Sequence, residues 1–174
     1  MKLALITGGS RGLGKALVDL YLQAGWTVRE FSRSGTSKEH IDCDFVDAMS
    51  SMRVIKDTFE DLSRQNWSDI VLINNVGVLS PIGPIETATV EQWQQNIQIN
   101  LNASIATTGL FIRHFSDTAA NRYVVNISSG AAVTPFFGWS LYCAAMAGLE
   151  AFTACVALEH AQRDNPVVVF SIRP

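Results

Sequence analysis

Short apolar runs alternate with amphipathic segments along the chain. Five runs rich in apolar residues have the length of buried strands, over residues 3–7, 26–32, 69–75, 122–129 and 166–172. Apolar residues recur at helical spacing in the segments between them, over 14–25, 48–65, 90–115 and 140–162. A short third strand is expected within 41–47, after a polar stretch.

Strands and helices that alternate in this way predict one α/β domain over 1–174. Because right-handed crossovers place helices on both faces, the pattern is typical of a Rossmann-type, doubly wound parallel sheet. In such sheets the ligand site lies beyond the carboxyl ends of the strands. We therefore expect the chemistry of this protein at that edge.

Composition and charge exclude several classes of protein. The chain has 174 residues, of which 48% are hydrophobic and 17% charged, as in an ordinary globular domain. The net charge is −3 and no basic run stands out, so nucleic acid is not an expected partner. Polar residues interrupt every apolar run before about 18 positions, which predicts no membrane span.

The N-terminus and the cysteines indicate a cytoplasmic location. Met1 leads directly into a strand-like run with no charged leader or cleavage site, so no secretory signal is expected. Cys43, Cys143 and Cys155 have no metal-like spacing and are expected to be reduced.

Residues 7–14, TGGSRGLG, form a glycine-rich turn between the first strand and the first helix. Gly8, Gly12 and Gly14 allow the backbone to turn tightly and to approach a pyrophosphate at the helix N-terminus. This placement predicts a dinucleotide site. The alternative is a tight strand-to-helix turn that binds no ligand.

The end of the second strand lacks the carboxylate that commonly binds the adenosine ribose of NAD. It carries Ser32 and Arg33 instead, and Arg11 lies inside the glycine turn. A guanidinium group binds phosphate oxygens well, so two arginines and a hydroxyl favour NADP(H) over NAD(H). The alternative is that both arginines are solvated surface groups.

Three further motifs join the glycine turn in chain order: NNVG at 74–77, NISSG at 126–130 and Tyr142. In this order and at these distances they resemble the short-chain dehydrogenase/reductase family over the whole chain. The stretches LINNVGVLSPIGPI, NISSGAAVTPFFGWSLYC and GLEAFT are similar to its sepiapterin reductase-like branch, and most of all to the bacterial benzil reductases that form (S)-benzoin.

The resemblance implies the catalytic residues. Asn100 would support a water chain, Ser129 would bind the substrate carbonyl, and Tyr142 would donate the proton in reduction. Ser129 rather than Ser128 stands at the family's distance before the tyrosine. The alternatives are that the two serines cap a strand and that the tyrosine is a packing residue.

The resemblance also implies the cofactor site. Asp44 and the backbone of Phe45 would hold the adenine, while Asn74, Asn75 and Gly77 would shape the floor of the adenosine and ribose site. The two asparagines could instead merely end a strand. The expected cofactor-binding residues are Gly8, Ser10, Arg11, Gly12, Leu13, Gly14, Ser32, Arg33, Asp44, Phe45, Asn75, Val76, Gly77, Tyr142 and Pro174.

One departure from the family pattern concerns the reaction itself. The family has a lysine one helical turn after the tyrosine, and here that position holds Met146. In the family this lysine binds the nicotinamide ribose and polarises the phenol, and a thioether does neither. A unit charge ~4–5 Å away, at an effective dielectric near 20, is worth roughly 3–4 kcal/mol before screening, or about two to three powers of ten in rate if fully used in the transition state.

Ketone reduction uses the protonated phenol, so the loss of the lysine is expected to harm alcohol oxidation more than reduction. The residues therefore predict a reductase with lowered turnover that keeps part of its cofactor binding. Relocated chemistry and an introduced substitution remain alternative explanations of Met146.

The second departure is the ending, FSIRP, where the family continues with a glycine, a mobile lid, a helix and a last strand. We therefore expect a domain truncated at its C-terminal side, with Pro174 near the cofactor's carboxamide end and apolar surface left uncovered.

Substrate and assembly are expected from the resemblance. It implies a small carbonyl substrate, an aromatic or vicinal diketone, reduced by NADPH. Phe136, Phe137 and Trp139 stand between the serine and the tyrosine, where they could stack on such a substrate or simply pack the loop onto the core. The family's pairing of the helices over 90–115 and 140–162 implies a homodimer.

Two other functions compete with an NADP(H)-dependent carbonyl reductase. A non-catalytic NADP(H)-binding sensor or partner subunit would explain Met146, although it has no need of Asn100, Ser129 and Tyr142 together. A different reaction on the same fold, such as epimerisation or dehydration, is the third alternative.

Overall fold

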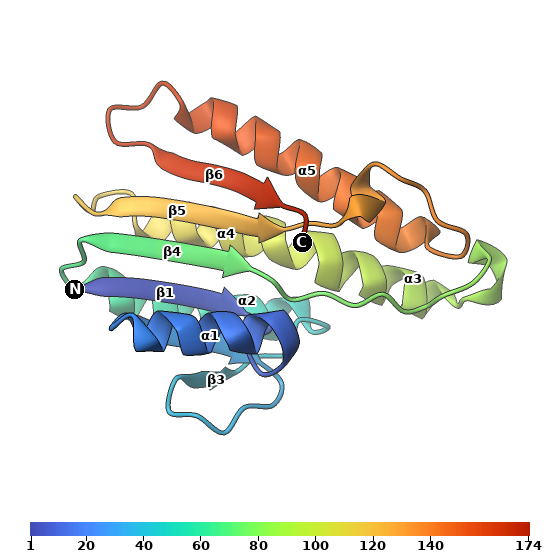
Figure 1. Cartoon of the computed structure of the whole chain (residues 1–174), viewed down its shortest axis with the longest axis horizontal. Helices are drawn as coiled ribbons and strands as arrows, with labels where there is room; N and C mark the ends of the chain where they lie inside the picture. The colour runs from blue at the N-terminus through green and yellow to red at the C-terminus, as the bar shows by residue number, and fades with distance from the viewer.

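One six-stranded parallel sheet organises the chain, and the computed structural model describes it over all residues, 1–174. The order of the strands is β3-β2-β1-β4-β5-β6 (Figure 1). This order, with a reversal between β1 and β4, is that of a Rossmann fold, so the predicted fold class is confirmed. The strands are β1 (Lys2–Thr7), β2 (Thr27–Ser32), β3 (His40–Asp42), β4 (Asp69–Asn74), β5 (Asn121–Ile127) and β6 (Val167–Ile172).

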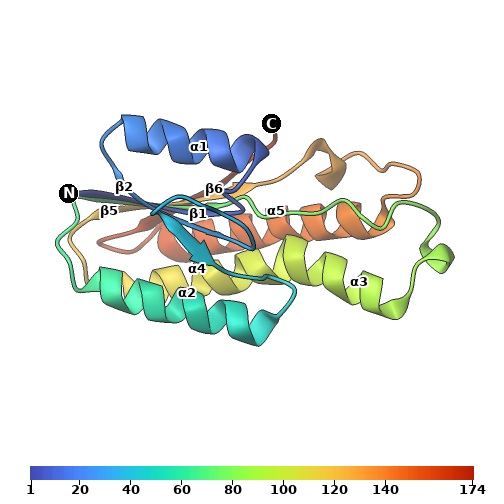
Figure 2. The ribbon, with the colours of Figure 1, turned by 90° about the horizontal axis from the view of Figure 1, so that it is seen from below.

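Helices cover the two faces of the sheet unequally. Helix α1 lies alone on one face, while α2, α4 and α5 lie on the other, with α3 extending beyond the sheet (Figure 2). The helices are α1 (Gly12–Gln23), α2 (Ala48–Ser63), α3 (Val90–Ile97), α4 (Ala103–His114) and α5 (Ser140–His160), with short 3-10 turns η1 (Ile85–Thr87) and η3 (Gly130–Ala132).

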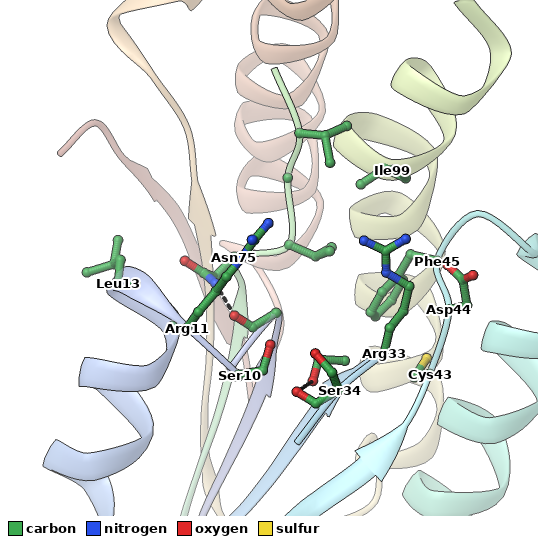
Figure 3. Close-up of a pocket in the computed structure, with 17 residues that line it drawn as sticks. Ser10, Arg11, Leu13, Arg33, Ser34, Cys43, Asp44, Phe45, Asn75 and Ile99 are labelled. Carbon is green, nitrogen blue, oxygen red and sulfur yellow. Dashed lines mark hydrogen bonds between the residues drawn. The ribbon is translucent and has the colours of Figure 1, made fainter. Parts of the chain in front are cut away.

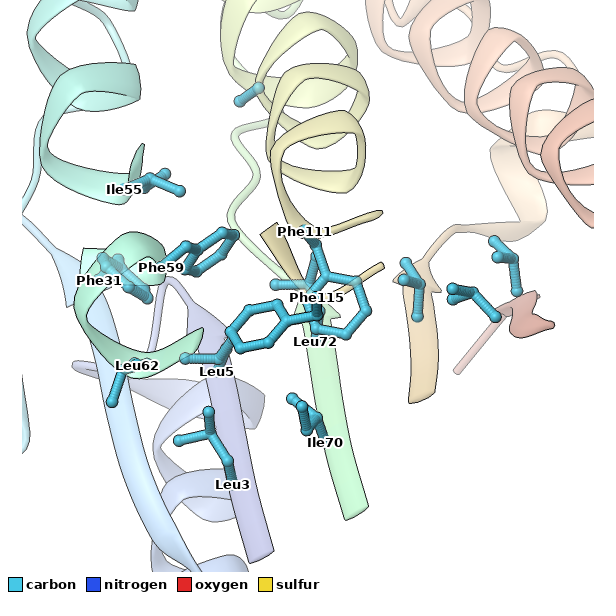
Figure 4. Packing of buried hydrophobic residues seen from close by; sticks show 14 of the residues in the cluster. Leu3, Leu5, Phe31, Ile55, Phe59, Leu62, Ile70, Leu72, Phe111 and Phe115 are labelled. Atoms are coloured by element: carbon cyan, nitrogen blue, oxygen red, sulfur yellow. The ribbon is translucent and has the colours of Figure 1, made fainter. Parts of the chain in front are cut away.

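The continuous apolar strands follow from burial on both faces. In β1, Leu3 and Leu5 belong to the larger core beneath α2 and α4, whereas Ala4 and Ile6 belong to the smaller core beneath α1. The larger core also holds a group of packed aromatic rings (Figure 4), namely Phe31, Phe59, Phe111 and Phe115.

Two predicted elements differ from the structure. The third strand is only His40–Asp42, because Asp44 Oδ1 accepts from the Val46 amide at 3.0 Å and the chain turns there into α2. The long helix predicted over 90–115 is divided into α3 and α4 by a π-helical segment, Gln98–Asn102 (η2), which the apolar spacing does not reveal.

Helix α5, which the sequence did not single out as a possible membrane span, is long and apolar enough to cross a membrane on length and composition alone. A core helix passes the same test, and α5 here packs against β6 and η3. Its middle carries Glu150, which accepts hydrogen bonds from Ser171 and Arg173.

The face of β6 that points away from α5 is open. Along β6, Val167 and Val169 are buried, whereas Val168, Phe170 and Ile172 are each more than 40% exposed. Period-two alternation therefore leaves an apolar strip on the same side of the sheet as α1.

Candidate functional site

A cavity of about 360 Å³ opens at the carboxyl ends of the first strands, between the glycine turn, the end of β2 and the segment after β4 (Figure 3). Every cofactor-binding residue expected from the sequence lines it except Tyr142 and Pro174. The lining residues are Gly8, Ser10, Arg11, Gly12, Leu13, Gly14, Ser32, Arg33, Ser34, Cys43, Asp44, Phe45, Asn75, Val76, Gly77, Val78 and Ile99.

Four of these lining residues were not expected. Ser34, Cys43 and Val78 each follow or precede an expected residue, so widening each motif by one position would have found them. Ile99 comes from the π-helical segment, and nothing in its sequence environment marks it.

Gly8 and Gly14 of the glycine turn leave no room for side chains. Gly8 has φ +70°, and a Cβ built on it would lie 2.9 Å from Val76 Cα. A Cβ on Gly14 would lie 2.1 Å from the Gly8 carbonyl oxygen and 2.5 Å from Asn75 Nδ2. The turn thus packs directly on the segment after β4, and the first turn of α1 faces the cavity.

Asn75 ties β4 to the turn that follows β1. Its Nδ2 donates to the carbonyl oxygens of Thr7 and Gly8, both at 3.0 Å. In return, Thr7 Oγ1 accepts from the backbone amides of Asn75 at 3.0 Å and Val76 at 3.1 Å. These bonds hold one wall of the cavity in place before any ligand enters.

The guanidinium groups of Arg11 and Arg33 project from two different walls, the glycine turn and the end of β2 (Figure 3). Both residues are exposed, and neither makes an ion pair within the chain. The acidic residue nearest in sequence, Glu30, is buried and does not line the cavity. This end of the cavity therefore presents cationic donors on two sides.

Cys43 lies in the same wall, but its thiol is unreactive. Burial raises the pKa of its thiol to about 12, with further increases from the charges of Asp42, Asp44 and Glu30. The thiol therefore stays protonated and serves as packing, because the thiolate is the reactive form.

Asn74 does not contribute to the cavity floor, which corrects the expectation. Its Nδ2 donates to Thr108 Oγ1 at 3.0 Å and to Asn126 Oδ1 at 2.8 Å, and Asn126 donates in turn to Thr153 Oγ1 at 2.8 Å. This buried ladder joins α4, β4, β5 and α5. Adjacent strand residues point to opposite faces, so only one of the two asparagines can reach the cavity.

Asn100 is buried in the π-helical segment and fully bonded. Its Oδ1 accepts from the Val78 amide at 2.8 Å, and its Nδ2 donates to the Val78 carbonyl at 2.7 Å and to Asn96 Oδ1 at 3.0 Å. Asn96 also donates to the Ser80 carbonyl at 2.8 Å. The two asparagines therefore fix the segment that runs from the cavity towards α3.

Ser129 lies at the end of β5, where its Oγ accepts from the Ala131 amide at 3.2 Å and caps η3. The preceding Ser128 donates its backbone amide to the Ile172 carbonyl at 2.7 Å, which joins the ends of β5 and β6. Since η3 packs against α5, the helix that carries Tyr142 is held beside this serine.

Tyr142 is half-buried in the first turn of α5. Its ring meets that of Trp139 edge-on, with centroids 6.0 Å apart, and Trp139 in turn meets Phe136 at 4.9 Å. Met146, one turn on, is only 3% exposed and belongs to an apolar cluster that includes Leu149 and the Tyr142 ring. The environment around the tyrosine is therefore apolar and without a cation.

A further turn along α5, Glu150 anchors the end of β6. It accepts from Ser171 Oγ at 2.8 Å and from Arg173 Nε at 2.9 Å. The Arg173 guanidinium holds the pKa of this carboxyl at about 2, well below its ordinary value. Pro174 follows as an exposed residue outside the cavity.

Comparisons with known proteins agree with this architecture. The family model described as short chain dehydrogenase matches residues 2–174. A benzil reductase ((S)-benzoin forming) of Bacillus cereus is 36% identical over 187 residues, covering 100% of this chain and 75% of that protein. The enzyme of the same description from Bacillus subtilis (strain 168) is 34% identical, covering 100% and 74%.

Solved structures repeat the fold. A short-chain dehydrogenase/reductase from Burkholderia vietnamiensis superposes with a TM-score of 0.88 at 25% identity, covering 99% of this chain and 82% of that one. A 4-hydroxyisoleucine dehydrogenase complexed with NADH, at 20% identity, superposes with a TM-score of 0.87 over 100% of this chain and 75% of its own. The family resemblance inferred from the motifs is confirmed.

Proposed function

Because the chain belongs to the short-chain dehydrogenase family, we propose that it is an NADPH-dependent carbonyl reductase acting on a small ketone or an aromatic diketone. The observation that carries the proposal is the cavity at the carboxyl edge, with its glycine turn and two free arginines, beside an α5 that bears Tyr142. The similarity to two benzil reductases favours an aromatic diketone as substrate.

The residues of the cavity fit a nicotinamide dinucleotide phosphate. Gly8 and Gly14 leave only backbone where a pyrophosphate would approach the N-terminus of α1. Arg11, Arg33 and the Ser32 hydroxyl would bind the adenosine 2′-phosphate through charge-assisted hydrogen bonds. Asp44 and the backbone of Phe45 would hold the adenine, at the outer wall of the same cavity.

When bound, a reduced nicotinamide would supply the hydride that reduces the carbonyl carbon. The protein would supply the proton and the geometry. The Tyr142 phenol would transfer its proton to the carbonyl oxygen as negative charge develops there, and the Ser129 hydroxyl would donate a hydrogen bond to the same oxygen. Asn100 would act by holding the backbone near Val78 in place.

Met146 would lower the rate of this reaction. The side chain has no donor for a ribose hydroxyl and no charge to polarise the phenol, and it packs with apolar neighbours instead. Reduction would continue because it uses the neutral phenol, whereas alcohol oxidation would suffer more.

An aromatic substrate would find aromatic neighbours at the mouth of the site. Phe136, Trp139 and Tyr142 form a chain of rings, and Phe137 is 90% exposed. The Gly83 amide donates to the Gly138 carbonyl at 2.9 Å, which joins the loop after β4 to the loop that carries these rings. Edge-on and offset contacts of this kind suit phenyl groups that flank a diketone.

We further propose a cytoplasmic homodimer. The three cysteines are free, in keeping with a reducing compartment. The outer surfaces of α4 and α5 carry exposed apolar residues such as Ile105 and Leu158, and association through these helices would cover them. Sedimentation equilibrium would test the oligomeric state directly.

Consumption of NADPH with benzil tests the function. The unchanged protein should oxidise NADPH at a measurable rate and form benzoin, and Tyr142→Phe should remove most of that rate while leaving NADPH affinity within about twofold. A tyrosine variant with the rate of the unchanged protein would defeat the proposed chemistry.

A second function, a non-catalytic NADP(H)-binding sensor or partner subunit, is favoured by one observation. Met146 is buried in an apolar cluster rather than directed to a polar site. Tight NADPH binding without turnover of any diketone would support this alternative over the reductase.

A further inference from the structure

A buried carboxylate–imidazole pair lies outside the site described above. Glu30 on β2 and His40 on β3 are register partners across the sheet edge, and Glu30 Oε1 lies 2.5 Å from His40 Nδ1. The Glu30 side chain is 3% exposed and that of His40 16%. No lysine or arginine nitrogen comes within 4 Å of this carboxylate, so the imidazole is its one basic neighbour within that distance.

Burial of a carboxylate costs free energy unless hydrogen bonds compensate for the lost water. The presence of Glu30 and His40 at this position therefore suggests that the pair has a function. The pair receives one more hydrogen bond, from Ser32 Oγ to Glu30 Oε1 at 3.2 Å, while Glu30 Oε2 is buried without a partner. Apolar residues of the same size would fill this space at lower cost. The position of the pair suggests what it does.

The pair touches both walls of the adenosine end of the cavity. On one side, a Cβ on Gly9, in the glycine turn, would lie 2.7 Å from Glu30 Cβ and 3.0 Å from Glu30 Oε2. On the other, a Cβ on Gly35 would lie 2.4 Å from His40 Nδ1 and 2.5 Å from Glu30 Oε1. The backbone of both walls therefore rests on these two side chains.

The loop that rests on the pair carries Arg33, one of the proposed phosphate ligands. Arg33 and Ser34 line the cavity directly before Gly35, and Ser32 directly before them bonds to Glu30. The exposed Arg33 side chain makes no ion pair within the chain, so the backbone position sets the region that its guanidinium can reach. A displaced Gly35 would displace Arg33 with it.

We propose that Glu30 and His40 are positioning residues that hold the loop 33–35 so that Arg33 faces the adenosine 2′-phosphate. The pair thus contributes to the preference for NADPH over NADH, and this inference rests on the NADPH preference proposed above. It assigns a task to a buried glutamate and a half-buried histidine that the chemistry of hydride transfer does not use.

The test compares the dissociation constants of NADPH and NADH, measured by titration of nicotinamide fluorescence. His40→Ala should weaken NADPH about tenfold but NADH less than about twofold, because only NADPH uses the loop. His40→Asn, which keeps a donor near the position of Nδ1, should recover most of the loss. Glu39→Gln is the matched control, because Glu39 is another buried glutamate beside the pair and should leave both constants unchanged.

Gly35→Ala tests the same idea from the loop side without opening the core. Its methyl group would push the loop off the pair, so it should reproduce the selective loss of NADPH affinity. Thermal melts check that each variant is folded. Glu30→Gln keeps the hydrogen bond to His40 and should stay within about threefold of the unchanged protein.

Three outcomes overturn the inference. In the first, His40→Ala and Gly35→Ala weaken the binding of NADPH and of NADH equally; in the second, both variants keep the NADPH preference of the unchanged protein. In the third, Glu30→Gln binds NADPH more tightly than the unchanged protein does. The last would mean that the pair acts through its charge rather than by position. Equal affinity of the unchanged protein for the two cofactors would defeat both the NADPH preference and this inference. A preference that the variants keep in full defeats this inference alone.

Discussion

Met146 and Tyr142, one helical turn apart on α5, share one apolar cluster, and with 3% exposure Met146 is shielded from solvent. The tyrosine proposed as proton donor therefore stands in an apolar cluster, between this thioether and the Trp139 ring. With Met146 at this position, no ammonium group stands one turn along the helix to polarise the phenol.

Met146→Lys should raise the rate of benzil reduction. An ammonium group at this position would polarise the phenol and offer a donor to the nicotinamide ribose, with about a ten- to hundredfold gain in kcat/KM for NADPH-dependent turnover. Initial rates of NADPH consumption, with benzoin identified as product, measure the effect.

The matched control is Met146→Leu, which keeps the apolar packing and adds no charge, so its rate should stay close to that of the unchanged protein. Because the position is buried, denaturation curves must accompany both variants. A folded lysine variant with no gain in rate would mean that the chemistry does not depend on this position.

The sequence predicted the cavity well because its signals are local. Gly8, Gly14 and Arg33 stand directly at the ends of β1 and β2, and a parallel sheet brings such ends to one edge whatever the rest of the chain does. The pair Glu30–His40 could not be predicted in this way. Its contact depends on the register of β2 and β3, and Glu30 by itself resembles a surface residue of a half-exposed strand.

The motifs also could not predict in which direction two neighbouring side chains point. Asn74 and Asn75 belong to one motif, yet the first enters the ladder through Asn126 and only the second reaches the glycine turn. The π-helical segment at Asn100 shifts the phase of the long helix, and apolar spacing averaged over many residues does not detect a single inserted position.

Gly14→Ala should disrupt the cofactor cavity, whereas Gly109→Ala should not. A Cβ on Gly14 would meet the Gly8 carbonyl oxygen at 2.1 Å, and backbone on both sides leaves no room to move, while a Cβ on Gly109 would meet nothing within 4 Å. Both glycines lie within helices, so the change in helix propensity is the same for the two.

We expect Gly14→Ala to lower the free energy of unfolding by about 2 kcal/mol or more and to abolish NADPH binding. Gly109→Ala should be neutral or stabilising by up to about 1 kcal/mol, because alanine reduces the freedom of the unfolded chain. Urea denaturation and a fluorescence titration of NADPH measure the two effects. Equal stability of the two variants would show that the turn can relax.

Glu150→Gln should weaken the fold at neutral pH and flatten its response to acid. The pKa of Glu150 is lowered to about 2 by the hydrogen bond and charge of Arg173, and its ordinary value is 4.5. The carboxylate therefore contributes stability above pH 4.5, and this contribution is lost as the pH falls from there towards 2.

The loss at neutral pH should be about 1 kcal/mol, since the pair is partly open to water and screening reduces its effect. Glu60→Gln is the control, because Glu60 forms an exposed pair with Arg64 on α2 and should change the stability by less than about 0.5 kcal/mol. Denaturant midpoints followed from neutral to acidic pH give both comparisons. An acid response that Glu150→Gln leaves unaltered would assign the effect to other carboxyls.

Because of His160, the free energy of unfolding should rise with pH. This rise should fall in a pH range above that in which Glu150 titrates. It is 4% exposed at the end of α5, and burial, followed by the charges of Arg163 and Arg122, lowers its pKa below the ordinary 6.5. Just below pH 6.5 His160 therefore binds a proton in the unfolded chain but not in the folded protein. The free energy of unfolding must fall as the pH drops through this window and level off once the folded state is protonated.

His160→Gln removes the titrating group and should flatten this slope, measured as the urea midpoint at closely spaced pH values between about 5 and 7.5. Glu150→Gln should keep the slope of the unchanged protein, because the Glu150 carboxyl titrates only below this window. If the glutamine variant at 160 retains the full slope, the proton is taken up elsewhere. The cluster of Arg122 and Arg163 around the imidazole would then have no part in the acid sensitivity of the fold.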